Sequence, residues 1–459
     1  MLKVKNKISI SSRTYNFGKD DSRSYIYDEE LRFEYLLEGV SSDIWYLIYS
    51  SHDYNSVLEY AKKCDVDDEL DEFLNDLYTN NLIEISNTKL IKNFKSSESN
   101  LKVADDLEIF DEERKAWMLE NNFLPQLVLQ LSFKCNLICK HCFNDKSHNS
   151  YEISLEEAKD IIDQAYDLGI TGVGLTGGEC TCHKHFMEIV RYIKEKGLCL
   201  YVITNGQVFY NNKKMFEEFI SLYPHRVKVS LYSMDPDVHD EITGVKGSHA
   251  KTIYVIKKLR EHNIKVVINC VQFKLNESSY LGVAEFAEEI GAGCNISSLF
   301  ITNYENKTDG LQLNDNDRKD FYLDQKNPAS VYNPGAEPRG VKRDDESVCR
   351  AGEIQLAVNP MLDVLPCNDF YYVLGNTKKD SLDYIWNNKI PKFRELHKRK
   401  NLDPECGTHA YCDYCTYCPV HVCAAADSDD WFMKKSESSC SDAKIYLNAL
   451  MKANDVPKV

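Results

Sequence analysis

The chain has 459 residues, including 17 cysteines, and a formal net charge of -17 at pH 7. This length predicts about two to four domains, and the acidic balance argues against nucleic-acid binding, which needs a basic surface. There is neither a charged-then-apolar N-terminal signal nor a run of roughly 18 apolar residues, so we expect a cytoplasmic protein that has no membrane span or membrane partner. In such a protein, many cysteines indicate metal clusters rather than disulfides.

The first hundred residues are predicted to form a hairpin followed by three small helices. The hairpin comprises residues 23–28 and 31–37, and a short apolar run at 82–85 ends the region. Apolar residues at helical spacing mark the helices, namely Ile44, Trp45 and Ile48, then Val57, Leu58 and Ala61, then Leu70, Phe73, Leu74 and Leu77. The polar stretch 86–106 is interpreted as a linker.

This order resembles the RiPP recognition element, a winged-helix module that binds the leaders of ribosomally synthesised, post-translationally modified peptides (RiPPs). The resemblance implies that residues 1–100 bind a precursor peptide. The peptide would add a strand to an exposed edge, for which we expect residues 31–36. A packing domain without a ligand is the alternative.

Three cysteines follow a buried-strand pattern in the middle of the chain. The apolar run 127–131 precedes Cys135, Cys139 and Cys142, which are spaced C-x3-C-x2-C. Three thiolates are one fewer than the ligands of a fully ligated four-iron cluster, so one iron would stay open for a substrate or cofactor. A second apolar run ends in Thr-Gly-Gly-Glu at 176–179.

These motifs resemble those of the radical S-adenosylmethionine (SAM) superfamily. The resemblance implies that the three cysteines hold a [4Fe–4S] cluster and that SAM chelates its open iron. It also implies that Gly177, Gly178 and Glu179 hold the methionyl amino group of SAM. His141 stands where the family usually has an aromatic residue beside the adenine.

From residue 151 onward, amphipathic helices alternate with short β-rich runs, which predicts βα units and a parallel sheet. One helix opens with the capping box Ser154-x-x-Glu157. The expected strands are 127–132, 172–176, 199–204, 227–232, 265–271 and 295–301. Six such strands predict an α/β fold with a partial (β/α)6 TIM-like barrel, whose ligands sit at the carboxyl ends of the strands.

Further polar residues fall at these strand ends. Thr204 and Asn205 follow the third strand, and Ser230 lies in the fourth. By family analogy they line the SAM pocket, with Ser230 near the ribose; ordinary turn and core roles are the alternative. Cys180, where the family commonly has proline, and Cys182 are interpreted as unligated thiols.

A second group of cysteines lies near the C-terminus. Its members are Cys349, Cys367, Cys406, Cys412, Cys415, Cys418, Cys423 and Cys440. Eight thiols suffice for two four-iron clusters, whereas the C-x2-C pairs taken alone leave structural zinc open.

The sequence around these cysteines resembles the SPASM extension of radical SAM peptide-modifying enzymes, which carries two auxiliary clusters. The resemblance rests on the segments Cys349-Arg-Ala-Gly, Asn359-Pro360, Pro366-Cys367, Gly375-Asn376 and 381–386. It implies an inner cluster on Cys349, Cys367, Cys406 and Cys423, and an outer cluster on Cys412, Cys415, Cys418 and Cys440. The spacing C-x2-C-x2-C-x4-C departs from the usual C-x2-C-x5-C-x3-C.

Together the resemblances imply three domains: a recognition-element-like domain at 1–100, a radical SAM partial barrel at 110–320 and a SPASM domain at 321–459. They imply an enzyme that uses SAM and three [4Fe–4S] clusters to install a crosslink in a ribosomal precursor peptide. The expected link is a Cys thioether, as in sactipeptide- and ranthipeptide-type enzymes, and the expected reductant is a flavodoxin or ferredoxin.

Several alternatives stay open at this point. A related enzyme would form a carbon–carbon crosslink, epimerise its peptide, or resemble the anaerobic sulfatase-maturating enzymes. A non-enzyme would be an iron–sulfur electron carrier or a zinc-stabilised scaffold.

Overall fold

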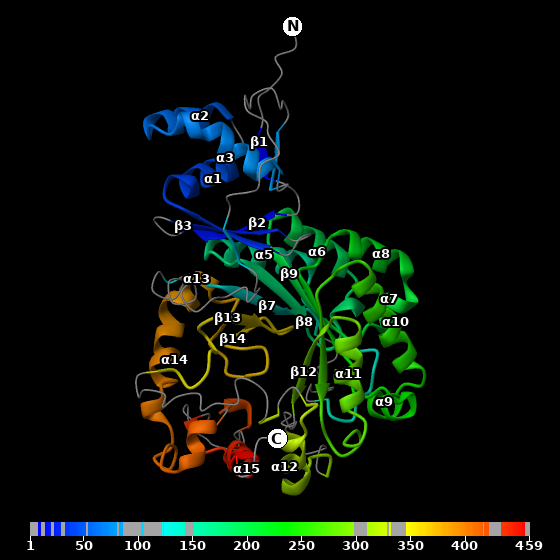
Figure 1. Cartoon of the computed structure of the whole chain (residues 1–459). Helices are drawn as coiled ribbons and strands as arrows, with labels where there is room; N and C mark the ends of the chain where they lie inside the picture. The colour runs from blue at the N-terminus through cyan, green and yellow to red at the C-terminus, as the bar shows by residue number, and fades with distance from the viewer. Residues whose placement is uncertain are drawn as a thin grey trace. The chain divides into compact units, whose positions relative to one another are not determined.

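The computed structural model divides the chain into two compact units, one of residues 1–121 with 195–199 and the other of residues 122–194 and 200–459 (Figure 1). The described residues are 8–10, 14–19, 23–28, 33–51, 54–79, 82–85, 102–104, 122, 124–142, 151–297, 310–327, 330–331, 346–415, 417–421 and 433–454. Within them, no helix has the length and apolar character that crossing a membrane requires.

The first unit combines three helices with two antiparallel sheets. Its strands are β1 (Ile8–Ile10), β2 (Thr14–Lys19), β3 (Arg23–Asp28), β4 (Phe33–Glu38), β5 (Ile83–Ile85) and β6 (Lys102–Ala104), and its helices are α1 (Val40–Ser51), α2 (Tyr54–Lys63) and α3 (Asp67–Thr79). The order is β2-β3-β4-β6 in one sheet, and β1 pairs with β5 in the other. Trp45, Val57 and Leu74 are fully buried between the helices. The predicted hairpin, helices and final short strand are confirmed.

Two expectations for this unit are wrong. Residues 34–36 of β4 pair with β6 as well as with β3, so the segment 31–36 is not an exposed edge. The outer strands of this sheet are β2 and β6. The strand β6 also falls inside the stretch interpreted as a linker, because three residues show too little periodicity to signal a strand that only its partner β4 stabilises.

The second unit is built on a nine-stranded sheet in the order β12-β11-β10-β9-β8-β7-β13-β14-β15. Its strands are β7 (Gln126–Gln130), β8 (Gly172–Thr176), β9 (Cys199–Thr204), β10 (Arg226–Ser230), β11 (Val266–Val271), β12 (Gly293–Ser297), β13 (Gln355–Val358), β14 (Asp363–Leu365) and β15 (Gly375–Asn376). The strands β7 to β12 pair in parallel, which confirms the six predicted strands and the partial barrel.

Helices alternate with the parallel strands and cover the outer face of the sheet (Figure 1). They are α5 (Leu155–Asp167), α6 (Phe186–Glu195), α7 (Gln207–Asn211), α8 (Lys213–Ser221), α9 (Pro236–Thr243), α10 (Ser248–Glu261) and α11 (Leu281–Glu289). The predicted capping box is confirmed: Glu157 N donates to Ser154 Oγ at 3.2 Å, and Ser154 N donates to Glu157 Oε2 at 2.9 Å.

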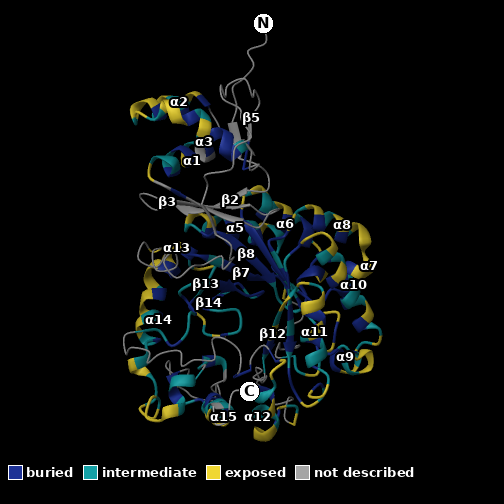
Figure 2. Ribbon diagram, in the orientation of Figure 1, coloured by how far each residue is buried: buried dark blue, intermediate teal, exposed yellow. Residues whose placement is uncertain are grey.

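Burial alternates along the strands because each one has a helix-covered face and an inner face. Figure 2 shows the sheet buried and the outward helix faces exposed. In β10, Val227 and Val229 are fully buried, whereas Lys228 and Ser230 on the other face are only partly buried. The inner face of the parallel strands is therefore accessible from the interior of the partial barrel.

The C-terminal region continues the same sheet. The strand β13 pairs in parallel with β7, and β14 and β15 follow in antiparallel order. Four further helices belong to it or precede it: α12 (Asp315–Leu323), α13 (Leu382–Tyr384), α14 (Ile390–Leu396) and α15 (Glu437–Asn454). Tyr322 on α12 donates to Asp442 on α15 at 2.6 Å, which ties these two helices together.

Candidate active site

The Gly-Gly pair brings the end of β8 against the chain that enters the cysteine loop. Gly178 N donates to Ser132 O at 2.7 Å, and Glu179 N donates to Lys134 O at 2.8 Å. A Cβ on Gly177 would lie 2.4 Å from Ser132 O, and one on Gly178 would lie 2.4 Å from Lys134 O. Gly177 also has a φ of +135°, which side chains rarely allow. Only glycine fits this approach.

Glu179 is a buried carboxylate held by hydroxyl and amide donors. Its Oε1 accepts from Thr181 N at 3.1 Å, Thr181 Oγ1 at 2.6 Å and Thr204 Oγ1 at 2.7 Å. Its Oε2 accepts from Asn205 N at 2.7 Å. Burial raises the pKa of Glu179, and no basic side chain of the described residues forms an ion pair with it. The carboxylate therefore suits a cationic ligand.

Asn205 links the two motifs. Besides its bond to Glu179, its Nδ2 donates to Asn136 Oδ1 at 2.7 Å and lies 3.9 Å from Cys135 Sγ. Thr252 Oγ1 donates to Asn205 O at 2.9 Å and fixes the turn from α10. The predicted residues Thr204 and Asn205 thus lie beside both the Gly-Gly-Glu segment and the cysteine loop.

The cysteine loop is anchored to the end of α9. Ile138 N donates to Thr243 O at 2.9 Å, and Lys140 N donates to Ile242 O at 2.9 Å. Gly244 has a φ of +70°, and a Cβ there would lie 2.9 Å from Ile138 O. The loop is therefore positioned by the main chain of an element about a hundred residues later in the sequence, through contacts that no sequence motif announces.

The thiols of the loop lie in one electrostatic environment. Burial raises the pKa of Cys135 to about 11; the Leu137 N–H, 3.4 Å from the sulfur, lowers it, and the charges of Glu179 and Cys142 raise it. Burial raises the pKa of Tyr232 as well, with contributions from the charges of Cys139 and Cys142. Thiols that oppose one another's ionisation suit a bound cation that replaces their protons.

His141 lies in an aromatic cluster at the edge of this site. Its ring centroid is 4.6 Å from that of Tyr232 and 5.1 Å from that of Phe273. Burial lowers the pKa of His141 to about 4, so the ring is neutral at pH 7. Ser230 shares a side-chain hydrogen bond with Tyr232. Sequence analysis missed Tyr232, because an isolated tyrosine beyond a strand carries no motif.

The two further thiols after Glu179 differ in environment. Cys180 is fully buried, and its Sγ lies 3.3 Å from Ile203 O. Cys182 is exposed, and its pKa is raised to about 12 by burial of the sulfur and by the charges of Glu179 and Cys135. Cys182 thus faces the site, whereas Cys180 packs behind it.

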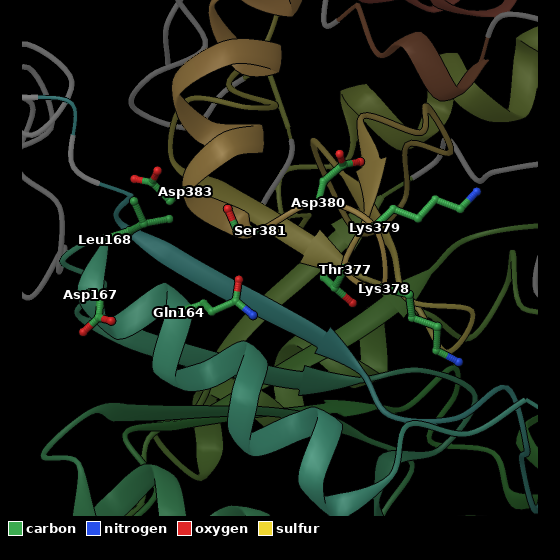
Figure 3. Close-up of a pocket in the computed structure, with 9 residues that line it drawn as sticks. All are labelled: Gln164, Asp167, Leu168, Thr377, Lys378, Lys379, Asp380, Ser381 and Asp383. Carbon is green, nitrogen blue, oxygen red and sulfur yellow. The ribbon is translucent and has the colours of Figure 1, made fainter.

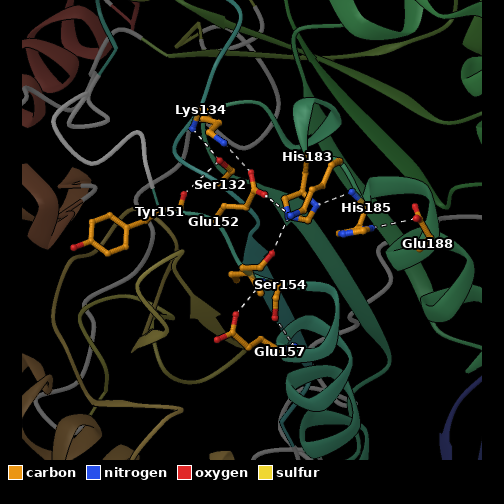
Figure 4. Close-up of polar contacts among 11 residues, drawn as sticks. Ser132, Lys134, Tyr151, Glu152, Ser154, Glu157, His183, His185 and Glu188 are labelled. Carbon is orange, nitrogen blue, oxygen red and sulfur yellow. Dashed lines mark hydrogen bonds and ion pairs between the residues drawn. The ribbon is translucent and has the colours of Figure 1, made fainter.

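A polar network supports the site from the side of α5 (Figure 4). His183 Nδ1 accepts from His185 N at 3.3 Å, so its proton lies on Nε2, which contacts Ile153 O at 2.8 Å. Glu152 forms ion pairs with Lys134 at 3.1 Å and with Lys184 at 3.5 Å. These contacts join the entry of the cysteine loop, the entry of α5 and the segment after Glu179. No sequence pattern predicted them.

The C-terminal cysteines gather in two groups. Burial, then Asp369, Cys349 and Cys418, raise the pKa of Cys367 to about 12. Burial, then Cys440, Cys412 and Cys406, raise the pKa of Cys415 to about 12. Relative to the expected partition, this grouping exchanges Cys406 and Cys418. Local spacing alone could not reveal it, and Cys423 lies outside the described residues.

No three His, Cys, Asp or Glu side chains among the described residues are close enough to hold a single metal ion. The thiol groups are therefore not arranged as a mononuclear zinc site in that part of the chain. Iron–sulfur clusters, in contrast, spread their cysteine ligands over several iron atoms.

A surface pocket of about 370 Å3 lies apart from these residues, between the end of α5 and the turn after β15 (Figure 3). Gln164 and Asp167 line one side, and residues 377–381 line the other. Gln164 Oε1 accepts from Leu382 N at 2.9 Å and joins the two sides. None of the predicted site residues lines this pocket.

Two family models match the chain. Residues 129–287 match the radical SAM superfamily, and residues 349–419 match an iron–sulfur cluster-binding domain known as SPASM. The chain is a radical SAM enzyme with a SPASM domain. Members bind SAM and a [4Fe–4S] cluster, and SPASM domains bind auxiliary iron–sulfur clusters. The buried, unpaired Glu179 and the two sets of thiols fit these groups.

Relatives with different substrates match over most of this region. The antilisterial bacteriocin subtilosin biosynthesis protein AlbA of Bacillus subtilis is 28% identical over 302 residues, which cover 62% of this chain and 66% of AlbA. An AdoMet-dependent heme synthase of Methanosarcina barkeri is 26% identical over 327 residues, 66% of this chain and 93% of the synthase. The match therefore spans just under two thirds of AlbA.

A solved structure with the same fold is that of Streptococcus suis SuiB bound to SAM. It has a TM-score of 0.56 and 19% identity, and the superposition covers 94% of this chain and 99% of SuiB. SuiB has also been solved bound to its precursor peptide SuiA, with a TM-score of 0.55. At this identity the likeness establishes the fold.

Proposed function

We propose that this enzyme matures a ribosomally synthesised precursor peptide, foremost by forming a Cys thioether. The observation that carries the proposal is the joining of a three-thiol loop to a buried, unpaired carboxylate at the ends of β7 and β8. A second set of thiols in the same unit and the likeness to AlbA support a peptide substrate.

The chain's own residues bind and orient the reactants. Glu179 Oε2 accepts one protein hydrogen bond and can accept another from the amino group of SAM. The Gly177–Gly178 backbone keeps that group close to the loop, and the neutral rings of His141 and Phe273 offer an apolar wall for the adenine. When bound, the cluster and SAM supply a radical that removes a hydrogen atom from an unactivated carbon.

The C-terminal thiols would hold the auxiliary clusters. We assign Cys349, Cys367 and Cys418 to the inner cluster, with Cys423 as its fourth ligand, and Cys406, Cys412, Cys415 and Cys440 to the outer one. The inner cluster, when loaded, offers an acceptor for the second electron that crosslinking releases, and the proton leaves to solvent.

Residues 1–100 would recruit the leader of the peptide. The sheet edges available for strand addition are those of β2 and β6. Deleting residues 1–100 should weaken peptide binding while slow SAM cleavage without peptide continues, and unchanged peptide affinity would remove the recruiting role. A cytoplasmic flavodoxin or ferredoxin would supply the first electron.

The test is coexpression with the short Cys-containing peptide encoded beside this gene. Each crosslink removes two hydrogens, so the peptide should lose about 2 Da per link. A thioether hides its sulfur from iodoacetamide, whereas a carbon–carbon link leaves every cysteine reactive. A peptide of unchanged mass with deuterium from solvent at an α-carbon would indicate epimerisation. An unmodified peptide would contradict peptide maturation and favour a substrate such as that of the heme synthase relative.

A further inference from the structure

Three polar side chains form a row across the inner face of the partial barrel. The parallel register places Ser230 of β10 beside Asn269 of β11, and Asn269 beside Asn295 of β12. On the opposite face of β11, Ile268 and Cys270 are buried beneath the helices. The row therefore looks into the barrel interior, level with the carboxyl ends of the strands.

The two asparagines orient each other and leave a matched pair of groups unused. Asn295 Nδ2 donates to Asn269 Oδ1 at 3.3 Å. Among the described residues, Asn269 Nδ2 and Asn295 Oδ1 have no partner. Asn295 is exposed and Asn269 partly buried. A donor next to an acceptor is the complement of one main-chain amide, whose C=O accepts and whose N–H donates.

The place of this pair in the sheet indicates which molecule it meets. Glu179, Thr204 and Ser230 lie at the ends of β8, β9 and β10, so the proposed SAM site occupies that part of the row. Neighbouring strands are about 4.8 Å apart, which puts Asn295 roughly 10 Å beyond Ser230. The strand β12 is also the edge of the nine-stranded sheet. A chain entering over that edge passes Asn295 and Asn269 before it reaches the SAM site.

We propose that Asn269 and Asn295 form a subsite that binds one main-chain amide of the peptide substrate and holds the adjacent carbon at the reacting position. This rests on the proposed function and deepens it. The peptide carbonyl accepts from Asn269 Nδ2, and its N–H donates to Asn295 Oδ1. An extended peptide loses its water on entering the barrel, so these bonds replace those it gives up. Because the contact is to the main chain, it tolerates different side chains at that residue.

The experiment uses the full, iron-loaded chain with the Cys-containing peptide encoded beside its gene. Asn269→Asp removes the donor but keeps the acceptor for Asn295, so the pair stays ordered. We expect KM for the peptide to rise roughly fivefold to tenfold. The amount of modified peptide formed per SAM cleaved should fall, whereas SAM affinity and cleavage without peptide stay within about twofold. Asn388→Asp adds the same charge to an exposed helix outside the barrel and should match the wild type.

Each other outcome is decisive. Equal loss of SAM binding or of peptide-independent cleavage in Asn269→Asp would place the pair in the SAM site and overturn the inference. Wild-type KM and wild-type coupling in both Asn269→Asp and Asn295→Asp would overturn it as well. If the wild-type chain leaves the peptide unmodified, the proposed function fails and the inference fails with it, and this result is distinct from modification by an unaffected variant.

Discussion

The cysteine loop at 135–142 and the cysteines beyond residue 400 are held in different ways. The loop is tied by main-chain hydrogen bonds to α9 and to the end of β8, both distant in sequence. The main-chain bonds of Cys406, Cys412 and Cys415 reach only three residues, to Asp403, His409 and Cys412. The fold thus shapes the first site in advance, whereas the second depends more on what its thiols bind.

The largest effect should come from removing the preformed site. Replacing Cys135, Cys139 and Cys142 together by Ala should abolish SAM cleavage and remove about one third of the roughly 12 iron atoms expected per chain. Iron analysis and detection of 5'-deoxyadenosine measure the two effects. Retained cleavage would contradict the assignment of the loop.

The next largest effect should come from crowding the Gly-Gly contact. In Gly178→Ala the new Cβ meets two carbonyl oxygens, Phe133 O and Lys134 O, at 2.4 Å. Separating the backbones should slow SAM cleavage by about a hundredfold and lower the free energy of unfolding by roughly 1–3 kcal/mol. In the control Gly282→Ala, the Cβ on α11 meets only Met234 side-chain atoms at 3.4 Å. Equal behaviour of the two variants would contradict the close approach.

A smaller effect is expected from neutralising the buried carboxylate. Glu179→Gln keeps the size of the side chain but cannot pair with a cation, so the Kd for SAM should rise about tenfold. Because burial opposes the charge of Glu179 in the unliganded protein, the variant should be at least as stable as the wild type. Calorimetric binding and thermal unfolding separate these effects. Weaker SAM binding that only accompanies unfolding would argue against a direct role.

The smallest expected effect compares the two regions directly. In iron-free protein, limited proteolysis should cut between 403 and 418 faster than within the cysteine loop, and loading with iron should slow the first cut severalfold. Mass spectrometry of the fragments locates the cuts. Equal rates in both segments would mean that the C-terminal cysteines are as firmly preorganised as the loop.

Sequence patterns predicted the elements of this fold better than their pairing. Buried runs such as 127–131 and the capping residue Ser154 act locally, so the six strands and α5 could be predicted. The pairing of β6 with β4, and of β13 with β7, depends on residues far apart in the chain. A single sequence does not encode that register in any local pattern.

The same limit applies to the site. Its motif residues could be identified because cysteines and glycines at fixed spacing are rare. The supporting residues His183, Tyr232 and Asn269 could not, because each acts through partners that only the folded chain brings together. The exchange of Cys406 and Cys418 between the two thiol groups has the same origin.

The most direct test measures 5'-deoxyadenosine and modified peptide together in the variant Cys349→Ala/Cys367→Ala. We predict that this variant still cleaves SAM, because the loop and Glu179 are intact, but releases peptide of unchanged mass. Loss of SAM cleavage with a correctly folded barrel, or formation of the normal product, would contradict the separate roles of the two regions.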